Sequence, residues 1–315
     1  MSRALFAVVV NWNGGYSNVL CLRSLVAHGV DEEHVVFVDN GSSDGSIERV
    51  ACEFPRASIL RNARNTGYGD GTNQGMKHAL ELGAELVFLV NNDVVVDPST
   101  LPALVRVLDE RPSVGIVGPR IVYASRPQVL WSAGGRMTYR QNLSELIGHD
   151  TPDREEYRRT LSVDYVAGCA LLVRRSVVEE IGFLDGEYFA YHEDVDFCLK
   201  AKEAGHDVLV VGEVRALHDA HQSTGGGYNR RRKYMMGVNT VWFLRRHGTP
   251  LRWASFLLFD VLTLPFVWCY RAVRGESGAV VAKARGTWDG LRGVRVSPEA
   301  VEESPLAPAT SDGEG

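Results

Sequence analysis

LVFLVNNDVVVD, residues 86–97, is the stretch that decides the fold. It begins with the continuous apolar run Leu86–Val90, which is typical of a strand buried on both faces. The run meets Asn91, Asn92 and Asp93 and then becomes apolar again. A carboxylate and two amides at the end of a buried strand indicate an edge of a sheet that binds a ligand.

The hundred residues around this stretch alternate between strand-like and helix-like patterns. The predicted strands are Leu5–Val10, Val35–Val38, Ala57–Leu60 and Leu86–Val90, and the predicted helices are 15–28, 46–54 and 72–82. Short strands alternating with helices predict βαβ units and a parallel sheet covered by helices on both faces. Right-handed crossovers then place the carboxyl ends of these strands along one edge, where open α/β sheets bind ligands.

Polar turns follow all four strands. They contain Asn11 to Asn13, Asp39 with Asn40, Arg64 with Asn65, and Asn91 to Asp93. Asn, Asp and Gly are the usual residues of turns, so an ordinary turn is the alternative for each of them. Four such turns on one edge favour a ligand site.

The second half of the chain indicates a mixed sheet that continues the first. The predicted strands are 114–123, 129–133, 137–139, 165–174, 208–211 and 214–217, and the predicted helices are 176–181 and 194–204. We expect one α/β domain over residues 1–227, with a nucleotide-binding half over about 1–100 and an acceptor and catalytic half over about 101–227. Helices follow over 228–295, and the acidic, Pro- and Ala-rich segment 296–315 is expected to be disordered.

Composition excludes several classes. The chain has 315 residues, is 45% hydrophobic and has a formal net charge of −5, so we expect a globular protein that does not bind nucleic acid. Five scattered cysteines without CxxC spacing predict reduced thiols in a cytoplasmic protein. The N-terminal apolar run is too short for a signal peptide.

Asp93 is the first residue suited to chemistry. Carboxylate and amide oxygens suit Mg²⁺ or Mn²⁺, and one carboxylate is enough when a diphosphate completes the coordination shell. The alternative role, capping of the next helix, is available to Asp97, which precedes Pro98. This favours a metal site at Asp93.

The stretch YHEDVDFCLKAKEAG, residues 191–205, crowds three carboxylates before a predicted helix: Glu193, Asp194 and Asp196. Acidic residues stabilise a helix N-terminus, which is one explanation for them. Capping needs only one acid, however. A carboxylate held at a helix N-terminus is also well placed to act as a general base, and we favour that interpretation.

The stretch LHDAHQSTGGG, residues 217–227, places His218 and His221 before a glycine-rich loop. Histidine is a good ligand for a divalent ion such as Mn²⁺, but a surface histidine without function is an equal alternative. The loop has the composition of a lid that closes over a ligand.

The stretch WASFLLFDVLTLPFVWCY, residues 253–270, is apolar and aromatic, with Arg252 before it and Arg271 after it. This pattern suits a helix lying in a membrane interface. A helix packed on the catalytic domain is the alternative, and the sequence leaves both open.

Six stretches, in order and together, resemble family 2 inverting glycosyltransferases of the GT-A fold, the nucleotide-diphospho-sugar transferase fold. The similarity covers residues 4–245 and is strongest to the rhamnosyltransferase-like branch that builds bacterial cell-surface glycans. The stretches are VVVNWNG, VFVDNGSSDGS, NTGYGDGTNQGM, FLVNNDVVVDP, VAGCALLVRRSVVEEIGFLDGEYFAYHEDVDFCLKAKEAGH and ALHDAHQST. Residues 91–93 stand where the family carries its DxD motif, with Asn91 replacing the first acid.

The resemblance implies a role for each matching position. Asp194 is the expected catalytic base with Glu193 beside it, and Asp93 and His218 are the expected ligands of a Mg²⁺ or Mn²⁺ cofactor. The residues implied to bind the nucleotide sugar are Asn11, Asn13, Asp39, Asn40, Arg64, Asn65, Asp70 and Asn92.

The implied activity is transfer of a sugar, with inversion, from a nucleoside-diphosphate sugar to a hydroxyl of a cell-surface glycan or a lipid-linked acceptor. The branch suggests dTDP-rhamnose as donor, a role in cell-wall or polysaccharide biosynthesis, and a place in the cytoplasm or at the inner face of the cell membrane. Two alternatives are a sugar-1-phosphate nucleotidyltransferase and a membrane-associated glycan-binding scaffold. Residues 8–20 lack the basic residue that a nucleotidyltransferase would carry in its N-terminal loop. The clustered carboxylates argue against a scaffold protein.

Overall fold

The computed structural model describes residues 4–140, 142–219 and 229–298. It forms two compact units. The sheet unit comprises Met1–Thr138, Ser144–Gly186 and Glu193–Ser223, and the helical unit comprises Tyr139–Leu143, Glu187–His192 and Thr224–Gly315. The predicted domain boundary at residue 227 stays a prediction. The sequence did not indicate that the two short segments Tyr139–Leu143 and Glu187–His192 group with the C-terminal helices.

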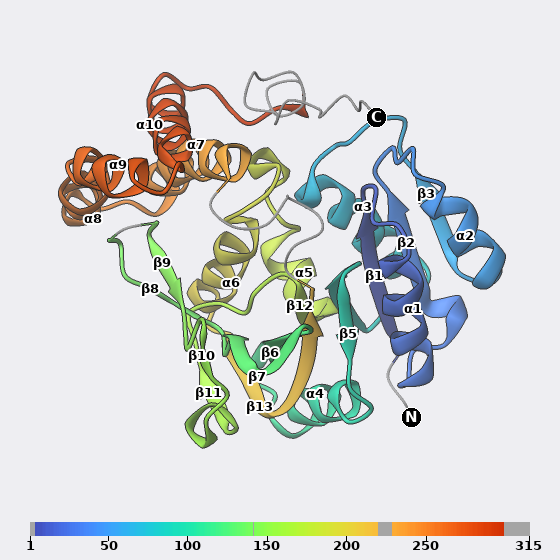
Figure 1. The fold of residues 1–315 in the computed structure, drawn as a ribbon. Coiled ribbons are helices and arrows are strands. Elements are labelled where there is room, and N and C mark those ends of the chain that lie inside the picture. The colour runs from blue at the N-terminus through green and yellow to red at the C-terminus, as the bar shows by residue number, and fades with distance from the viewer. Residues whose placement is uncertain (1–3, 141, 220–228, 299–315) are drawn as a thin grey trace. The chain divides into compact units, whose positions relative to one another are not determined.

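Four parallel strands form the N-terminal half of the sheet, in the order β3-β2-β1-β4 (Figure 1). They are β1 (Leu5–Asn11), β2 (Val35–Asp39), β3 (Ser58–Arg61) and β4 (Leu86–Asn91). Asn11 pairs with Asp39, and Val10 pairs with Asn91. The strands therefore end together, as predicted, and their polar turns share one edge, here called the carboxyl edge.

The second half of the sheet is mostly antiparallel. Next to β4 lies antiparallel β12 (Ala170–Arg174), and β6 (Val114–Tyr123), β7 (Arg126–Ser132) and β10 (Thr151–Pro152) continue the sheet. The long strand β13 (Asp207–His218) pairs with β6, β5 (Val94–Val96) and β11 (Thr160–Ser162). These eleven strands confirm the predicted mixed sheet. A separate hairpin joins β8 (Gly135–Met137) to β9 (Ser144–Leu146).

Among the described residues, six helices flank this sheet, and five of them match the predicted helix ranges approximately. They are α1 (Ser17–Ala27), α2 (Ser46–Glu53), α3 (Tyr68–Glu81), α4 (Thr100–Glu110), α5 (Arg175–Ile181) and α6 (Glu193–Glu203). Short 3₁₀ turns cover Glu32–His34, Glu155–Tyr157 and Gly186–Tyr188. Helix α3 begins four residues before the predicted start. A Cβ on its Gly75 would lie 2.3 Å from Val8 Cγ1, so the glycines of this segment allow close packing of helix on sheet.

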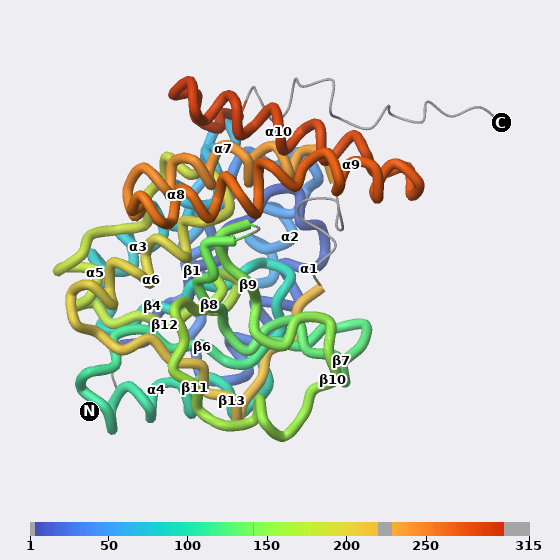
Figure 2. The backbone as a smooth tube through the Cα atoms, turned by 90° about the vertical axis from the view of Figure 1, so that its left-hand side faces the viewer, coloured from blue at the N-terminus to red at the C-terminus, as the bar shows by residue number. Residues whose placement is uncertain are grey.

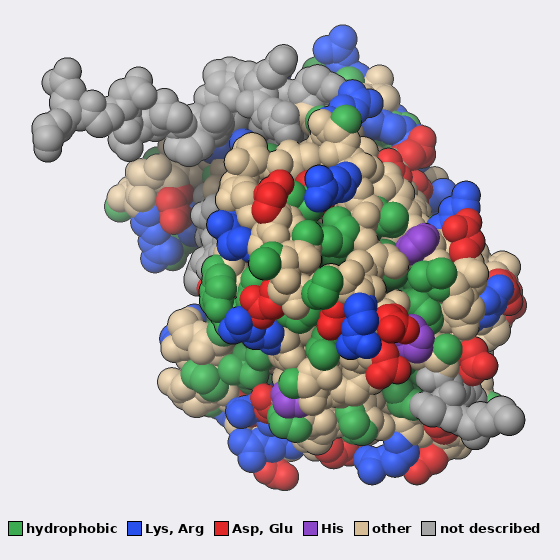
Figure 3. Space-filling model, turned by 90° about the vertical axis from the view of Figure 1, so that its right-hand side faces the viewer, with side chains coloured by type: hydrophobic (Ala, Val, Ile, Leu, Met, Phe, Trp, Pro, Cys, Tyr) green, Lys and Arg blue, Asp and Glu red, His purple; other side chains and the backbone are tan. Residues whose placement is uncertain are grey.

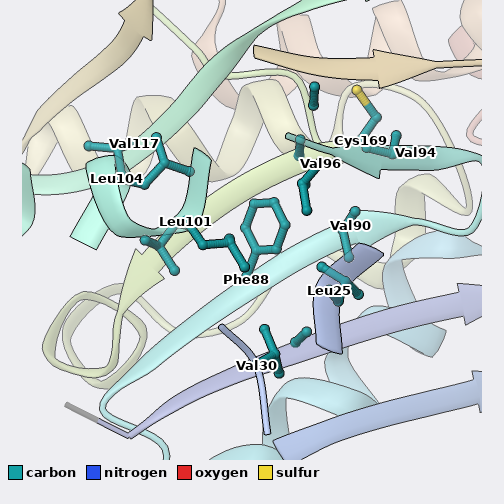
Figure 4. Close-up of a cluster of buried hydrophobic side chains, with 14 of the residues drawn as sticks. Leu25, Val30, Phe88, Val90, Val94, Val96, Leu101, Leu104, Val117 and Cys169 are labelled. Atoms are coloured by element: carbon teal, nitrogen blue, oxygen red, sulfur yellow. The ribbon is translucent and has the colours of Figure 1, made fainter. Parts of the chain in front are cut away.

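The core of the sheet unit is built around Phe88 of β4, which is fully buried (Figure 4). Leu25 of α1, Val90 and Leu101 of α4 lie around its ring, with other apolar side chains from β5 and β6. Burying one such large apolar side chain stabilises a fold by about 1.5–3 kcal/mol. This packing fixes β4, and hence the polar residues that follow it.

The helical unit contains α7 (Arg230–His247), α8 (Pro250–Phe256), a π-helical turn (Leu257–Val261), α9 (Leu264–Ala272) and α10 (Ser277–Leu291). Figure 2 shows α8 and α9 as one continuous rod. Helices α7 and α10 pack closely because glycines line their contact: a Cβ on Gly286 would lie 2.1 Å from the Tyr234 carbonyl oxygen. Asn229 Oδ1 caps α7 by accepting the Arg232 N–H at 2.8 Å.

Charged side chains of both signs are interspersed over the face of the sheet unit drawn in Figure 3. The expectation that nucleic acid is not a partner stays a prediction.

Candidate active site

Helix α6 holds the predicted base in a fixed position. Asp194 Oδ2 accepts the Gly168 N–H at 2.8 Å, and its Oδ1 accepts the Val195 N–H at 2.9 Å. The Gly168 carbonyl accepts the Tyr68 hydroxyl at 2.7 Å. A Cβ on Gly168 would lie 3.0 Å from Asp194 Cβ, so this glycine allows the close approach of the carboxylate.

The other two acids of the cluster have different surroundings. Asp196 is fully buried and pairs with Lys200 at 2.7 Å, one helical turn away, which is a structural role. Glu193 is also buried, and its Oε2 has no hydrogen-bond partner within the part of the chain that the structure describes. A buried carboxylate oxygen without a partner is costly when charged.

Burial changes the ionisation of these groups. It raises the pKa of Glu193 well above its ordinary value, and the negative charges of Asp194 and Asp196 raise it further. Burial also raises the pKa of Asp194, although the N–H groups of Gly168 and Val195 oppose this by stabilising the charged form. Two carboxyls with raised pKa values at one helix N-terminus are typical of a catalytic site.

We expect the substitution Glu193→Gln to flatten the dependence of stability on pH. A carboxyl whose pKa is raised in the folded state holds its proton more tightly there, so stability is lost as pH rises through that pKa. The free energy of unfolding, measured in urea at about pH 5 and about pH 8, should fall less with rising pH in the variant than in the parent protein. Equal slopes would show that Glu193 is not perturbed.

The predicted metal ligands meet at the end of β13. Asp93 precedes β5, and His218 pairs with Val94 as the last residue of β13. The distance from His218 Nε2 to Asp93 Oδ1 is 3.3 Å, and both side chains are buried. The rings of Trp131 and His218 are nearly perpendicular, with centroids 4.8 Å apart, so this contact helps to orient the imidazole.

The two clusters lie on the same carboxyl edge. The Asn91 N–H donates to the Cys169 carbonyl at 3.0 Å, and Gly168, the preceding residue, holds Asp194. After burial, the largest contributions to the raised pKa of the Cys169 thiol are the charges of Asp93 and Asp194. The two residues before β12, Gly168 and Cys169, therefore lie between the predicted base and the end of β4 that leads to the predicted metal ligand.

Asn11 organises the turns of this edge. Its Nδ2 donates to Asp39 Oδ1 at 2.8 Å and to the hydroxyls of two serines after β2, and its Oδ1 accepts the Asn92 Nδ2 at 3.0 Å. Asp39 Oδ2 accepts the Ser42 N–H at 3.0 Å. Asn11, Asp39 and Asn92 are all buried, so their described contacts hold the loops together. Direct contact of these residues with a nucleotide stays a prediction.

Asn40 performs the same task one loop further. Its Nδ2 donates to the Gly67 carbonyl at 2.9 Å, and its Oδ1 accepts the Asn62 side chain at 2.8 Å. Asn65 Oδ1 accepts the Gly67 N–H at 2.9 Å. These bonds shape the turn that leads into α3.

The remaining predicted nucleotide contacts are more accessible. Asn13 Oδ1 accepts the Ser43 N–H at 2.9 Å, and Arg64 and Asp70 are exposed. Partial burial and the charge of Asp185 raise the pKa of Asp70. The roles of all three stay predictions. His221 and most of its glycine-rich loop lie outside the described residues.

A groove of about 480 Å³ lies away from both clusters, between β3 and α3, and is lined by Arg61, Asn62 and Lys77 among others. It contains none of the predicted site residues.

Two residues of the edge were not predicted. Trp131 contacts His218 from 87 positions away in the chain, and Tyr68 joins Gly168 from 100 positions away. Tyr68 falls inside the quoted stretch NTGYGDGTNQGM, so the motif was a usable signal for it. The sequence contains no comparable signal for Trp131, because the position of Trp131 depends on the pairing of β7 with β6.

The positions of Asp93 and His218 suit a divalent ion that receives only some of its coordinating atoms from the protein. Within residues 4–140, 142–219 and 229–298, no group of three His, Cys, Asp or Glu side chains could hold a metal. Asp93 and His218 form a pair, and their 3.3 Å separation is close to the roughly 3.0 Å between adjacent octahedral ligands at ~2.1 Å from one ion. The residues therefore fit an ion completed by water or phosphate oxygens.

The chain matches one known family over most of its length. The model of the family described as "Glycosyltransferase like family 2" matches residues 3–237. The chain belongs to this family. The resemblance inferred from the motifs is confirmed, and the chain is a family 2 glycosyltransferase.

Two relatives of this family 2 glycosyltransferase are named as rhamnosyltransferases. N-acetylglucosaminyl-diphospho-decaprenol L-rhamnosyltransferase of Mycobacterium tuberculosis is 27% identical over 280 residues, which are 80% of this chain and 89% of that protein. dTDP-rhamnosyl transferase RfbF of Shigella flexneri is 23% identical over 259 residues, which are 80% of this chain and 83% of that protein.

A solved structure confirms the fold. Mannosyltransferase PcManGT from Pyrobaculum calidifontis, in complex with GDP-Man and Mn²⁺, matches with a TM-score of 0.58 at 14% identity. The match covers 92% of this chain and 88% of that protein. The family 2 glycosyltransferase described here therefore has the predicted GT-A fold.

Proposed function

We propose that this glycosyltransferase moves a sugar from a nucleoside-diphosphate sugar to an acceptor hydroxyl by one direct displacement, which inverts the anomeric carbon. The observation that supports this most strongly is the placement of Asp93 and Asp194 on one edge, linked through Cys169 and Gly168. A displacement needs a site for the leaving diphosphate and a base for the incoming alcohol. Asp93 would help to hold the ion that binds the diphosphate, and Asp194 would take the proton.

Asp194 is the proposed base. An acceptor hydroxyl becomes a good nucleophile as a carboxylate takes its proton, and such assistance contributes about 10²–10⁴ in rate. The raised pKa of Asp194 makes its carboxylate a stronger base than an ordinary aspartate. Two backbone N–H groups orient it.

Asp93 and His218 are the proposed ligands of Mg²⁺ or Mn²⁺. When bound, the ion supplies positive charge that stabilises the leaving diphosphate. Trp131 holds the His218 ring and the Asn11 network holds the loop before Asp93, so both ligands are oriented in advance.

The proposed donor is dTDP-rhamnose and the proposed acceptor is a lipid-linked glycan. The support is the printed names of the two relatives, one a dTDP-rhamnosyl transferase and the other a rhamnosyltransferase whose name contains a diphospho-decaprenol acceptor. Such an acceptor places the enzyme at the inner face of the cell membrane and its product in cell-surface polysaccharide.

A panel of nucleotide sugars tests this proposal. We expect dTDP-rhamnose, with Mn²⁺ present, to raise the melting temperature more than UDP-, GDP- or other dTDP-sugars do, because a ligand stabilises the folded state by mass action. Slow release of dTDP from the stabilising donor would follow by chromatography. If a different nucleotide sugar gave the largest rise in melting temperature, that sugar would replace rhamnose in the proposal. If no nucleotide changed the melting temperature, with or without metal, the transferase proposal would be rejected.

A further inference from the structure

An apolar helix of the helical unit is exposed along most of its length. Within the described residues, the helix Pro250–Ala272 is long and apolar enough to cross a membrane, with a mean hydropathy of 1.5. Only 11% of its apolar window is buried. The exposed side chains include Leu251 (80%), Leu262 (63%) and Phe266 (78%), followed by Val273 (91%). A patch of this kind marks an interaction surface.

The one acidic residue of this helix points away from the exposed patch. Asp260 is 2% exposed and forms an ion pair with Lys283 of α10. Lys283 Nζ also donates to Asn142 Oδ1 at 2.9 Å, and the Asn142 N–H donates to Asp260 Oδ2 at 3.2 Å. Because these three residues satisfy one another, the outer face of the helix is free of negative charge.

Arginines and aromatic rings border the patch. The Arg252 guanidinium lies 4.2 Å from the Tyr139 ring centroid, and that of Arg274 lies 4.4 Å from the Tyr270 ring centroid. Trp268 and Tyr270 are 45% and 55% exposed. Aromatic rings and arginines around an apolar face are typical of helices that lie at the boundary between lipid headgroups and acyl chains.

The same contacts argue against a helix that crosses the bilayer. Helix α10 follows after a short turn, packs on α9 and contributes Lys283 to the buried ion pair. It also carries Arg285 and Asp289, which are paired at 3.7 Å. A crossing helix would take this charged partner into hydrocarbon, where ionised groups are costly.

We propose that α8 and α9 form an interfacial anchor for anionic bilayers, with the face from Leu251 to Val273 inserted among the headgroups and the Asp260–Lys283 pair on the protein side. This inference rests on the proposed function for its purpose, since a lipid-linked acceptor is confined to a membrane. The contact itself follows from exposure and charge.

Vesicle flotation of the full-length protein tests the anchor. We expect it to float with phosphatidylcholine vesicles that contain phosphatidylglycerol, less so with phosphatidylcholine alone, and less at high salt. The double substitution Leu262→Glu with Phe266→Glu should weaken binding at least ~10-fold, because it puts charge on the inserted face. Both side chains are exposed, so the fold should be retained, as circular dichroism would check.

The matched control is Leu20→Glu with Leu82→Glu, two exposed leucines of the sheet unit (46% and 50%). It should bind vesicles as the parent does. Flotation of the Leu262/Phe266 variant equal to that of the parent, or failure of the parent to float, would overturn the anchor. Retention of the protein in membranes after alkaline carbonate extraction would overturn the interfacial position and show that the helix crosses.

Metal-dependent nucleotide binding, measured on the same samples, separates this inference from the proposed function. The Leu262/Phe266 variant should bind the nucleotide as the parent does. If the parent protein binds the nucleotide but does not bind vesicles, only the anchor hypothesis is rejected. If the parent protein binds vesicles but does not bind the nucleotide, only the proposed transferase function is rejected.

Discussion

Replacing Asp194 by Asn is expected to lower the turnover number about 10²–10⁴-fold while the affinity for the nucleotide sugar stays unchanged. The amide cannot accept the proton of the acceptor hydroxyl, but it can keep one of the two hydrogen bonds that Asp194 accepts from the backbone. Turnover would be measured as sugar transfer, and donor affinity by calorimetry in the presence of Mn²⁺.

Glu203→Gln is the matched control for this substitution. Glu203 is an exposed acid at the other end of the same helix, so its variant should keep full turnover. If Asp194→Asn instead lost donor binding and turnover together, or unfolded at a much lower temperature, Asp194 would be a structural residue and the base would have to be sought elsewhere.

Replacing Asp93 by Asn should abolish the stabilisation that Mn²⁺ gives in the presence of a nucleoside diphosphate, and lower turnover by about 10²–10³-fold. A neutral amide is a weaker ligand than a carboxylate for a hard cation, and the leaving diphosphate would lose part of its compensating charge. Thermal unfolding with dTDP, with and without Mn²⁺, measures the first effect without any need for an acceptor.

Asp97→Asn provides the comparison for Asp93. Asp97 lies four residues further along, pairs with Arg215 at 2.7 Å and is 31% exposed in its side chain. Losing this surface ion pair costs little stability. An Asp97 variant that lost the Mn²⁺ effect while the Asp93 variant kept it would move the metal site away from His218.

The order of elements was predictable where one local pattern dominates. Leu86–Val90 is apolar without interruption, so its assignment as a buried strand needed no knowledge of its neighbours, and β4 matches it to within one residue. Strand β13 was predicted wrongly as two strands, because Gly212 and Glu213 resemble a turn. The chain continues through an irregular register between Val211 and Arg215, and Gly212 lies against the backbone of Tyr157, where no Cβ would fit.

The site was predictable in its chemistry but not in its connections. Clustered acids at 193–196 and the polar residues at 91–93 are visible in the sequence, and the structure brings them to one edge. The central hydrogen-bonding role of Asn11 depends on partners from two other connections, after β2 and after β4, which no local pattern reveals. The antiparallel insertion of β12 beside β4 was likewise invisible, because pairing order is set by the packing of the whole sheet.

The pairing of Asn91 with Cys169 has a consequence for engineering this enzyme. Gly168 contacts the proposed base, and Cys169 contacts Asn91, two residues before the proposed metal ligand. A graft of segments from a relative should therefore keep these two positions unchanged, so that both proposed sites stay aligned. Hybrid proteins joined within β12 after Ala170 should stay active. A junction between Val166 and Cys169 should displace the proposed base from the proposed metal site, even when the hybrid folds.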